Sequence, residues 1–179
     1  GGGGGGGSGG GGGLSDGQYR NTADGVYSTE FNFQSMLGSI NALSLNDYGY
    51  SGEGVRVAVV DSGIDSTHPE FDGKTINGQD FANSLSGYGA DENGHGSHVA
   101  SIIAGERDGS GMRGFAYDAT LYDYKVDSDG ADGLDALNTD SEIAAVFNRH
   151  VTDNIHVSNN SWGSGTSVTL DTEAVIRAL

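Results

Sequence analysis

Three short segments with the apolar pattern of β-strands occur along the chain. They span 55–60, 120–126 and 155–158. The first consists mainly of β-branched and small apolar residues, whereas the second alternates between apolar and polar positions. A continuous apolar run of this length, bounded by turn residues, is typical of a strand that is covered on both faces.

Between these runs, apolar residues recur with the spacing of a helix face. The pattern occurs at 34–45, in the ten residues that follow His95, and after a capping box formed by Thr139 and Glu142. Strands that alternate with helices predict an α/β fold, a three-layer parallel sheet with helices on both faces. The apolar residues that carry the helical patterns are Met36, Ile40, Leu43, Val99, Ile102, Ile103, Ile143, Val146 and Phe147.

The first strand leads directly to an acidic residue. Asp61 follows the run at 55–60, and Ser62-Gly63 then turns the chain. This order places a carboxylate at the carboxyl end of a buried strand. In open α/β sheets ligands bind at that edge, so Asp61 is a candidate functional residue.

The second candidate is a histidine at the start of a predicted helix. His95 stands between Gly94 and Gly96, and neither neighbour has a side chain that would crowd a substrate. Asp61 and His95 are 34 positions apart in the sequence, which leaves room for the chain to return to the same sheet edge. An aspartate that accepts the proton of one imidazole nitrogen fixes the tautomer and leaves the other nitrogen to act as a base.

Three segments of the chain resemble motifs of the subtilisin-like serine proteases. The segment Val57-Ala-Val-Val-Asp61-Ser-Gly-Ile-Asp-Ser-Thr-His-Pro-Glu-Phe71 is similar to their aspartate box. Their histidine box is matched by Asn93-Gly-His95-Gly-Ser-His-Val-Ala-Ser-Ile-Ile-Ala-Gly105, with Ser97 where threonine is usual. Asn159-Asn-Ser161-Trp-Gly163 resembles the strand that pairs with the substrate backbone. The motifs occur in the order of this family, aspartate before histidine, over roughly 38–179.

The resemblance implies a serine-type endopeptidase that cleaves protein or peptide substrates with an Asp-His-Ser triad. Asp61 and His95 would be its catalytic aspartate and histidine, and Ser161, Trp162 and Gly163 would bind the substrate. The family's nucleophile comes much later and opens a helix of small residues. Ser167, four residues after Gly163, is therefore interpreted as a loop serine. The fold is expected to be truncated before the catalytic-serine segment, and the chain as given is expected to be inactive.

Within this family, the motif sequences most resemble those of the protease passenger domains of Gram-negative autotransporters. The similarity rests on 68–71, 111–121 and 159–163, although Tyr117 stands where many members carry proline. It implies a secreted or cell-surface protein, a passenger at the outer membrane, with a carboxy-terminal membrane β-barrel in the full-length protein.

Composition divides the chain into two parts. Residues 1–13 are twelve glycines and Ser8, a composition that predicts a disordered linker. Residues 14–179 are long enough to bury a core, but they are shorter than a complete subtilisin-like domain. We therefore expect 14–179 to be the N-terminal part of a peptidase domain.

The charge of the chain excludes one class of partner. Eight basic and 25 acidic residues give a formal net charge of −17, which repels nucleic acid and anionic membranes. Cysteine is absent, so neither a disulfide framework nor thiol chemistry is available. No nucleic-acid partner is expected, and the first thirteen residues show no signal-peptide pattern.

A metal-dependent hydrolase is the alternative to the triad. His95 and His98, with Asp61, Asp65 and Glu70 nearby, suggest a metal-dependent hydrolase, but the zincin pattern places its histidines four residues apart around a glutamate. Asp65 and His68 are interpreted as residues that shape the loop after the first strand. The triad needs no metal and no cofactor for catalysis, so no metal ligands are assigned.

The acidic loop 127–133 resembles a calcium loop but lacks the spacing of an EF-hand. A structural calcium ion stays an open alternative there. A non-enzymatic alternative also stays open, in which a pseudoprotease or peptide-binding module keeps the cleft without the nucleophile. The residues downstream of Leu179 would distinguish it from the enzyme.

Overall fold

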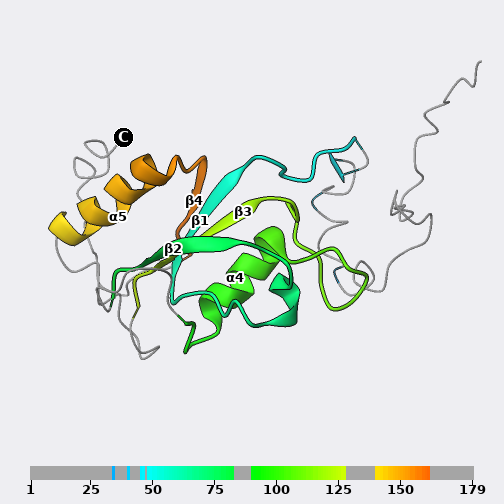
Figure 1. Ribbon diagram of the computed structural model, residues 1–179, viewed down its shortest axis with the longest axis horizontal. Helices are drawn as coiled ribbons and strands as arrows, with labels where there is room; N and C mark the ends of the chain where they lie inside the picture. The colour runs from blue at the N-terminus through cyan, green and yellow to red at the C-terminus, as the bar shows by residue number, and fades with distance from the viewer. Residues whose placement is uncertain are drawn as a thin grey trace, which may run out of the picture.

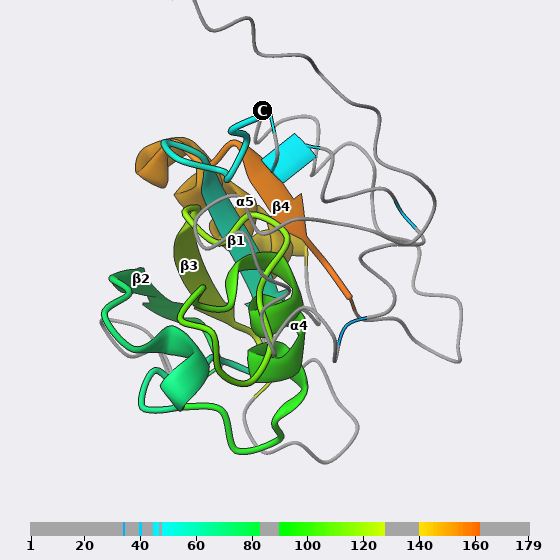
Figure 2. The same cartoon turned by 90° about the vertical axis from the view of Figure 1, so that its right-hand side faces the viewer.

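The computed structural model describes residues 48–82, 90–127 and 140–161, together with Gln34, Ile40 and the pair 45–46. Four parallel strands form one sheet in the order β2-β3-β1-β4, which can be followed from left to right in Figure 2. The strands are β1 (Arg56–Asp61), β2 (Ile76–Asp80), β3 (Thr120–Lys125) and β4 (Val157–Asn159). The helices are the 3-10 helix η1 (Pro69–Phe71), α4 (His95–Ala104) and α5 (Asp140–Asp153).

The two α-helices cover opposite faces of this sheet (Figure 1). Because side chains alternate along a strand, β1 contributes to both cores. Val57 and Val59 pack with Ala100 and Ala104 of α4, whereas Ala58 and Val60 pack with residues of α5. On the α5 face the core consists of Ala58, Val60, Tyr124, Val126, Ile143 and Val146.

The central strand β1 sets the register of the functional edge. It pairs with β3 from Arg56 opposite Thr120 to Asp61 opposite Lys125. On its other side, Val59 lies opposite Asn159 of β4. Since all of these strands are parallel, their carboxyl ends meet at one edge of the sheet.

The three-layer α/β fold predicted from the hydrophobic pattern is confirmed. The strands expected at 55–60 and 120–126 lie within one residue of β1 and β3, and the strand expected at 155–158 begins two residues later as β4. The polar strand β2 was not predicted, because its sequence Ile-Asn-Gly-Gln-Asp has a single apolar residue.

Several sequence predictions lie outside the described residues. They are the linker at 1–13, nearly all of the helix at 34–45, the capping residue Thr139, and the acidic loop after Asp127. The domain boundary at residue 14 therefore stays a prediction. Of the helices that the structure describes, none has the length and apolar character needed to cross a membrane.

Candidate active site

Asp61 is the last residue of β1, and its side chain is 4 % exposed. The turn that follows points its first amide back at the carboxylate, so that the N–H of Ser62 donates to Asp61 Oδ1 at 2.8 Å. The other carboxylate oxygen, Oδ2, is buried without a hydrogen-bond partner among the described residues. A buried carboxylate with so few donors depends strongly on each of them.

His95 begins helix α4 and contacts this carboxylate. Its Nδ1 lies 2.7 Å from Asp61 Oδ1, and since the carboxylate is an acceptor, Nδ1 is assigned the proton. The His95 side chain is 48 % exposed, and its Nε2 bonds to none of the residues that the structure describes. The imidazole is thus oriented from its buried side, while its second nitrogen is open to a reactant.

Two glycines permit this contact. Gly94 has a φ of 90°, a left-handed conformation that turns the chain into α4. Gly96 packs against the turn after β1, and a Cβ at this position would lie 2.1 Å from the carbonyl oxygen of Gly63. Any larger residue at 96 would therefore push the start of α4 away from Asp61.

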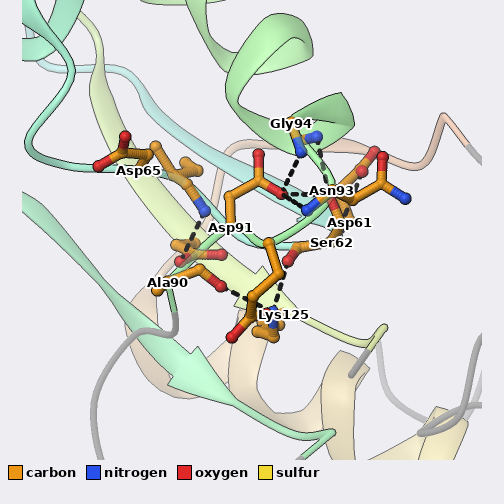
Figure 3. A network of polar contacts seen from close by, with 12 residues as sticks. Asp61, Ser62, Asp65, Ala90, Asp91, Asn93, Gly94 and Lys125 are labelled. Carbon is orange, nitrogen blue, oxygen red and sulfur yellow. Dashed lines mark hydrogen bonds and ion pairs between the residues drawn. The ribbon is translucent and has the colours of Figure 1, made fainter. Parts of the chain in front are cut away.

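A second carboxylate, that of Asp91, is hydrogen-bonded to Ser62 in the turn after β1 and to Gly94 at the start of α4 (Figure 3). It accepts hydrogen bonds from the amides of Gly94 and Ser97 and from the hydroxyls of Ser62 and Ser97. Burial acts to raise the pKa of Asp91, but these hydrogen bonds outweigh it and hold the pKa below its usual range. Asp91 is therefore a stable anion in the folded protein.

A buried cation lies on the other side of the same loops. Lys125, the last residue of β3, is 1 % exposed, and its Nζ donates to the carbonyls of Ser62 and Ala90 and pairs with Glu92. Sequence reasoning identified neither Lys125 nor Asp91. Two signals were available: a lysine inside a buried strand needs a partner, and an aspartate shortly before a helix often binds its free amides.

Asp123 lies deeper on the α4 side of the sheet and is fully buried. Its Oδ2 accepts from the N–H of Ile64, whereas Oδ1 has no hydrogen-bond partner among the described residues. Burial raises the pKa of Asp123 to about 8, against the opposing effects of the Ile64 amide and of Lys125. At neutral pH this group is therefore mostly protonated, in contrast to the Asp91 carboxylate.

Of the predicted substrate-binding residues, the structure describes Ser161, while Trp162 and Gly163 lie outside the described part. Ser161 is exposed, follows β4 by two residues, and accepts a hydrogen bond from Asn159 Nδ2 at 2.9 Å. Ser161 thus follows the carboxyl end of β4, and Asp61 is the last residue of the parallel neighbouring strand β1.

Of the acidic residues in the metal interpretation, Asp61 contacts His95, whereas Asp65 and Glu70 bond elsewhere. Asp65 Oδ1 accepts from the amide and hydroxyl of Thr67, and His68 Nδ1 accepts from the amide that begins η1. Glu70 Oε1 instead accepts from the amide of Met112. In the described part of the chain, no three histidine or acidic side chains form a potential metal site. Asp65 and His68 shape their own loop, as the sequence indicated.

Comparison with known proteins identifies relatives of this chain. The model of the Subtilase family matches residues 52–177. Subtilisin E of Bacillus subtilis is 37 % identical over 134 residues, covering 74 % of this chain and 33 % of that protein. The extracellular serine protease of Serratia marcescens is 38 % identical over 144 residues, which are 78 % of this chain and 12 % of that protein.

Solved structures show the same likeness. Fervidolysin from Fervidobacterium pennivorans, described as a keratinolytic enzyme related to subtilisin, aligns with a TM-score of 0.63 and 29 % identity. The alignment covers 89 % of this chain and 26 % of fervidolysin. Sphericase aligns with a TM-score of 0.57 and 28 % identity over 72 % of this chain and 43 % of that structure. The chain thus spans a third of the length of subtilisin E and less than half of these two solved chains.

Proposed function

Because the chain belongs to the subtilase family, we propose that it supplies the aspartate and histidine of the catalytic triad of a serine endopeptidase. One observation carries the proposal. Asp61 holds Nδ1 of His95 at 2.7 Å, while no described residue binds Nε2 of the same ring. This is the geometry that a general base requires before it takes a proton from a hydroxyl nucleophile.

In the proposed reaction, the Nε2 of His95 takes the proton of a serine hydroxyl as the serine oxygen attacks a peptide carbonyl. His95 is then an imidazolium, whose positive charge the Asp61 carboxylate stabilises. The proton passes from Nε2 to the leaving amine when the peptide bond breaks. A water then repeats the sequence to release the acyl group, and no step needs a cofactor.

We place the serine and the oxyanion donor beyond Leu179, in a segment of the full-length protein that follows this chain. The relatives are longer than the chain by enough to contain both. The exposed end of β4, with Ser161, Trp162 and Gly163, would add backbone hydrogen bonds to an extended protein or peptide substrate.

The same relatives support a proposal about location. The Serratia marcescens protein is named an extracellular serine protease, and the matched part covers only 12 % of it. We propose that this protein is likewise secreted or displayed at the surface of a Gram-negative cell as the passenger of an autotransporter. Full-length protein found in washed outer membranes or in the culture medium would support this proposal, and retention in the cytoplasm would contradict it.

The catalytic proposal is tested with the full-length protein and with this 179-residue chain. The full-length protein should hydrolyse casein and should be labelled by a fluorophosphonate at one serine beyond Leu179. The chain alone should do neither, because loss of the nucleophile costs about 10⁶-fold in kcat and loss of one oxyanion donor about 3 to 4 kcal/mol.

Two results would overturn the proposal. Labelling of the chain at Ser167 would show that the nucleophile is already present. Full-length protein that binds peptides without cleaving them, and that carries another residue at the serine position, would identify a peptide-binding pseudoprotease. Chelation with EDTA is expected to leave kcat unchanged. If the loop after Asp127 binds calcium, removal of the ion by EDTA should lower the thermal unfolding midpoint.

A further inference from the structure

The carboxylate of Asp91 collects an unusual number of hydrogen bonds for a residue outside the proposed triad. Its Oδ1 accepts from the hydroxyl of Ser62 at 2.9 Å and from the amides of Asn93 at 3.1 Å and Gly94 at 2.8 Å. Its Oδ2 accepts from the amide of Ser97 at 2.9 Å and from the hydroxyl of Ser97 at 2.6 Å. Five donors from four residues therefore converge on one anion (Figure 3).

These donors are the chain neighbours of the proposed catalytic residues. Ser62 directly follows Asp61, and Gly94 directly precedes His95. The Ser62 hydroxyl, while donating to Asp91, also accepts from the amide of Gly96 at 3.0 Å. A continuous path of hydrogen bonds thus joins the backbone on both sides of His95 to the residue after Asp61.

From these contacts we propose that Asp91 is a positioning residue, which fixes the distance between the Asp61 carboxylate and the His95 imidazole. The inference rests on the proposed function, since it assigns a role within the same site. No hydrogen bond joins the Asp91 carboxylate to the His95 ring or to the Asp61 carboxylate. It acts through Ser62 and Gly94, which set where the two side chains begin.

The number of donors explains why a carboxylate is needed here. Both of its oxygens face backbone N–H groups, which cannot be turned into acceptors. An asparagine at 91 would have to direct its amide NH₂ at one of these N–H groups, whichever way it is flipped. One side of the path would then open, and the start of α4 would shift relative to the end of β1.

Lys125 makes the arrangement two-sided. Its Nζ, buried below the same loops, donates to the carbonyl of Ser62 at 2.8 Å and to the carbonyl of Ala90 at 2.7 Å. Asp91 therefore binds N–H and O–H groups of the turn after β1 and of the segment before α4, while Lys125 binds carbonyls of the same two segments. A shift of either segment would break hydrogen bonds to both charged groups, so Asp91 and Lys125 together resist small displacements.

The test is Asp91→Asn in the full-length protein, with kcat expressed per active site titrated by a fluorophosphonate. We expect kcat to fall about 10²-fold, because a displacement of about 1 Å between reacting groups costs that much. KM is expected to stay within about twofold, because β4 and Ser161 bind none of the Asp91 donors. Asp65→Asn is the matched control: it removes the same charge from the adjoining loop, where Thr67 is the partner, and should keep the wild-type kcat.

A spectroscopic measurement separates positioning from loss of fold and from the proposed function itself. The proton on Nδ1 of His95 lies in a short hydrogen bond to Asp61, which shifts its ¹H NMR resonance downfield. Asp91→Asn should move or abolish this resonance, and Asp65→Asn should leave it in place. The resonance needs no turnover, so it reports on Asp91 even in a protein that cleaves no peptide.

Ser62→Ala is a second variant, in case Asp91→Asn does not fold. It removes the link from Asp91 to Gly96 and leaves the carboxylate itself, so a smaller loss of about tenfold in kcat is expected. An unchanged kcat per active site and an unchanged resonance in both variants would overturn the positioning role and leave the proposed function standing. Activity absent from the wild type, with the resonance still dependent on Asp91, would overturn the proposed function alone.

Discussion

Helix α4 begins at His95 on one face of the sheet, helix α5 carries His150 on the other face, and the two imidazoles differ in what their second nitrogen does. On the α4 face, His95 gives Nδ1 to Asp61 and leaves Nε2 without a described partner. On the α5 face, His150 Nδ1 donates to the carbonyl of Val146 at 2.8 Å, and its Nε2 accepts from the hydroxyl of Ser158 at 2.8 Å. Orientation by an oxygen acceptor is common to both rings, so orientation alone does not mark a catalytic histidine.

The surroundings of His150 show what a structural histidine looks like in this fold. Its ring stacks on Phe147 and meets the edge of Tyr124, and the residue is 8 % exposed. Burial lowers the pKa of His150, although its bond to the Val146 carbonyl opposes this. The ring is therefore neutral, and it fixes the end of α5 to β4 through Ser158.

The kind of acceptor also separates the two rings. His95 faces a buried carboxylate, which can stabilise a positive imidazolium when the ring takes a proton. His150 bonds to a neutral carbonyl in an apolar core, where the hydration that a positive ring would lose outweighs the attraction of Asp153. Of these two rings, that of His95 combines a nitrogen without a described partner and a directly bonded carboxylate.

The largest expected effect comes from substituting each of these two histidines in turn. His95→Ala in the full-length protein should lower kcat by about 10⁶-fold, the loss that removal of the triad histidine causes in subtilisin, a relative of this chain. His150→Gln should cost about 1 to 3 kcal/mol of stability and leave kcat per active site unchanged. Peptide hydrolysis and urea unfolding of both variants measure the contrast. A loss of kcat in folded His150→Gln would break it.

A second prediction concerns the buried carboxyl group of Asp123, which lies on the α4 face of the sheet. Its pKa is raised from 3.8 to about 8 in the folded protein. Between these values the Asp123 carboxyl holds a proton in the folded state that it lacks in the unfolded state, so its contribution to stability is fully present below pH 3.8 and is lost as the pH rises through about 8. Asp123→Asn cannot ionise. It should therefore be more stable than the wild type at pH 8, by roughly 3 to 6 kcal/mol, with little difference near pH 4.

Urea unfolding at pH 4, 6 and 8 measures this difference. Asp72→Asn is the matched control, because it removes the same charge from an exposed position and should change stability by less than about 0.5 kcal/mol. Equal stabilities of Asp123→Asn and the wild type at pH 8 would contradict the raised pKa. A fall in kcat at pH 8 in the variant would instead give Asp123 a part in the chemistry.

How much of this site the sequence predicts depends on the kind of interaction. Strand β1, helix α4 and the positions of Asp61 and His95 follow from local patterns, because apolar spacing and glycines act within a few residues. The partners of Asp91 and Lys125 do not follow, since those contacts join loops that are brought together only by the packing of α4 on the sheet. The polar strand β2 was missed for a related reason: its pairing with β3 supplies the order that its composition does not.

The smallest expected effect belongs to Ser158, the partner of the structural histidine. Ser158→Ala removes the hydroxyl that donates to His150 Nε2 and should cost about 1 kcal/mol of stability at pH 7, with kcat unchanged. The pKa of His150 is lowered in the folded protein, so its contribution is fully present above about pH 6.5 and is lost as the pH falls through the folded value.

Urea unfolding at pH 7 and pH 5 therefore sharpens the comparison between the two faces. Acidification should lower the stability of the wild type more than that of His150→Gln, because the variant has no ring to protonate at this position. The control His98→Gln changes an exposed position of α4 and should lose as much stability as the wild type. If His150→Gln lost as much stability between pH 7 and pH 5 as the wild type, the ring would not be held neutral by its burial. The α5 face would then contain a histidine that accepts protons as freely as an exposed one, and burial would no longer distinguish His150 from His95.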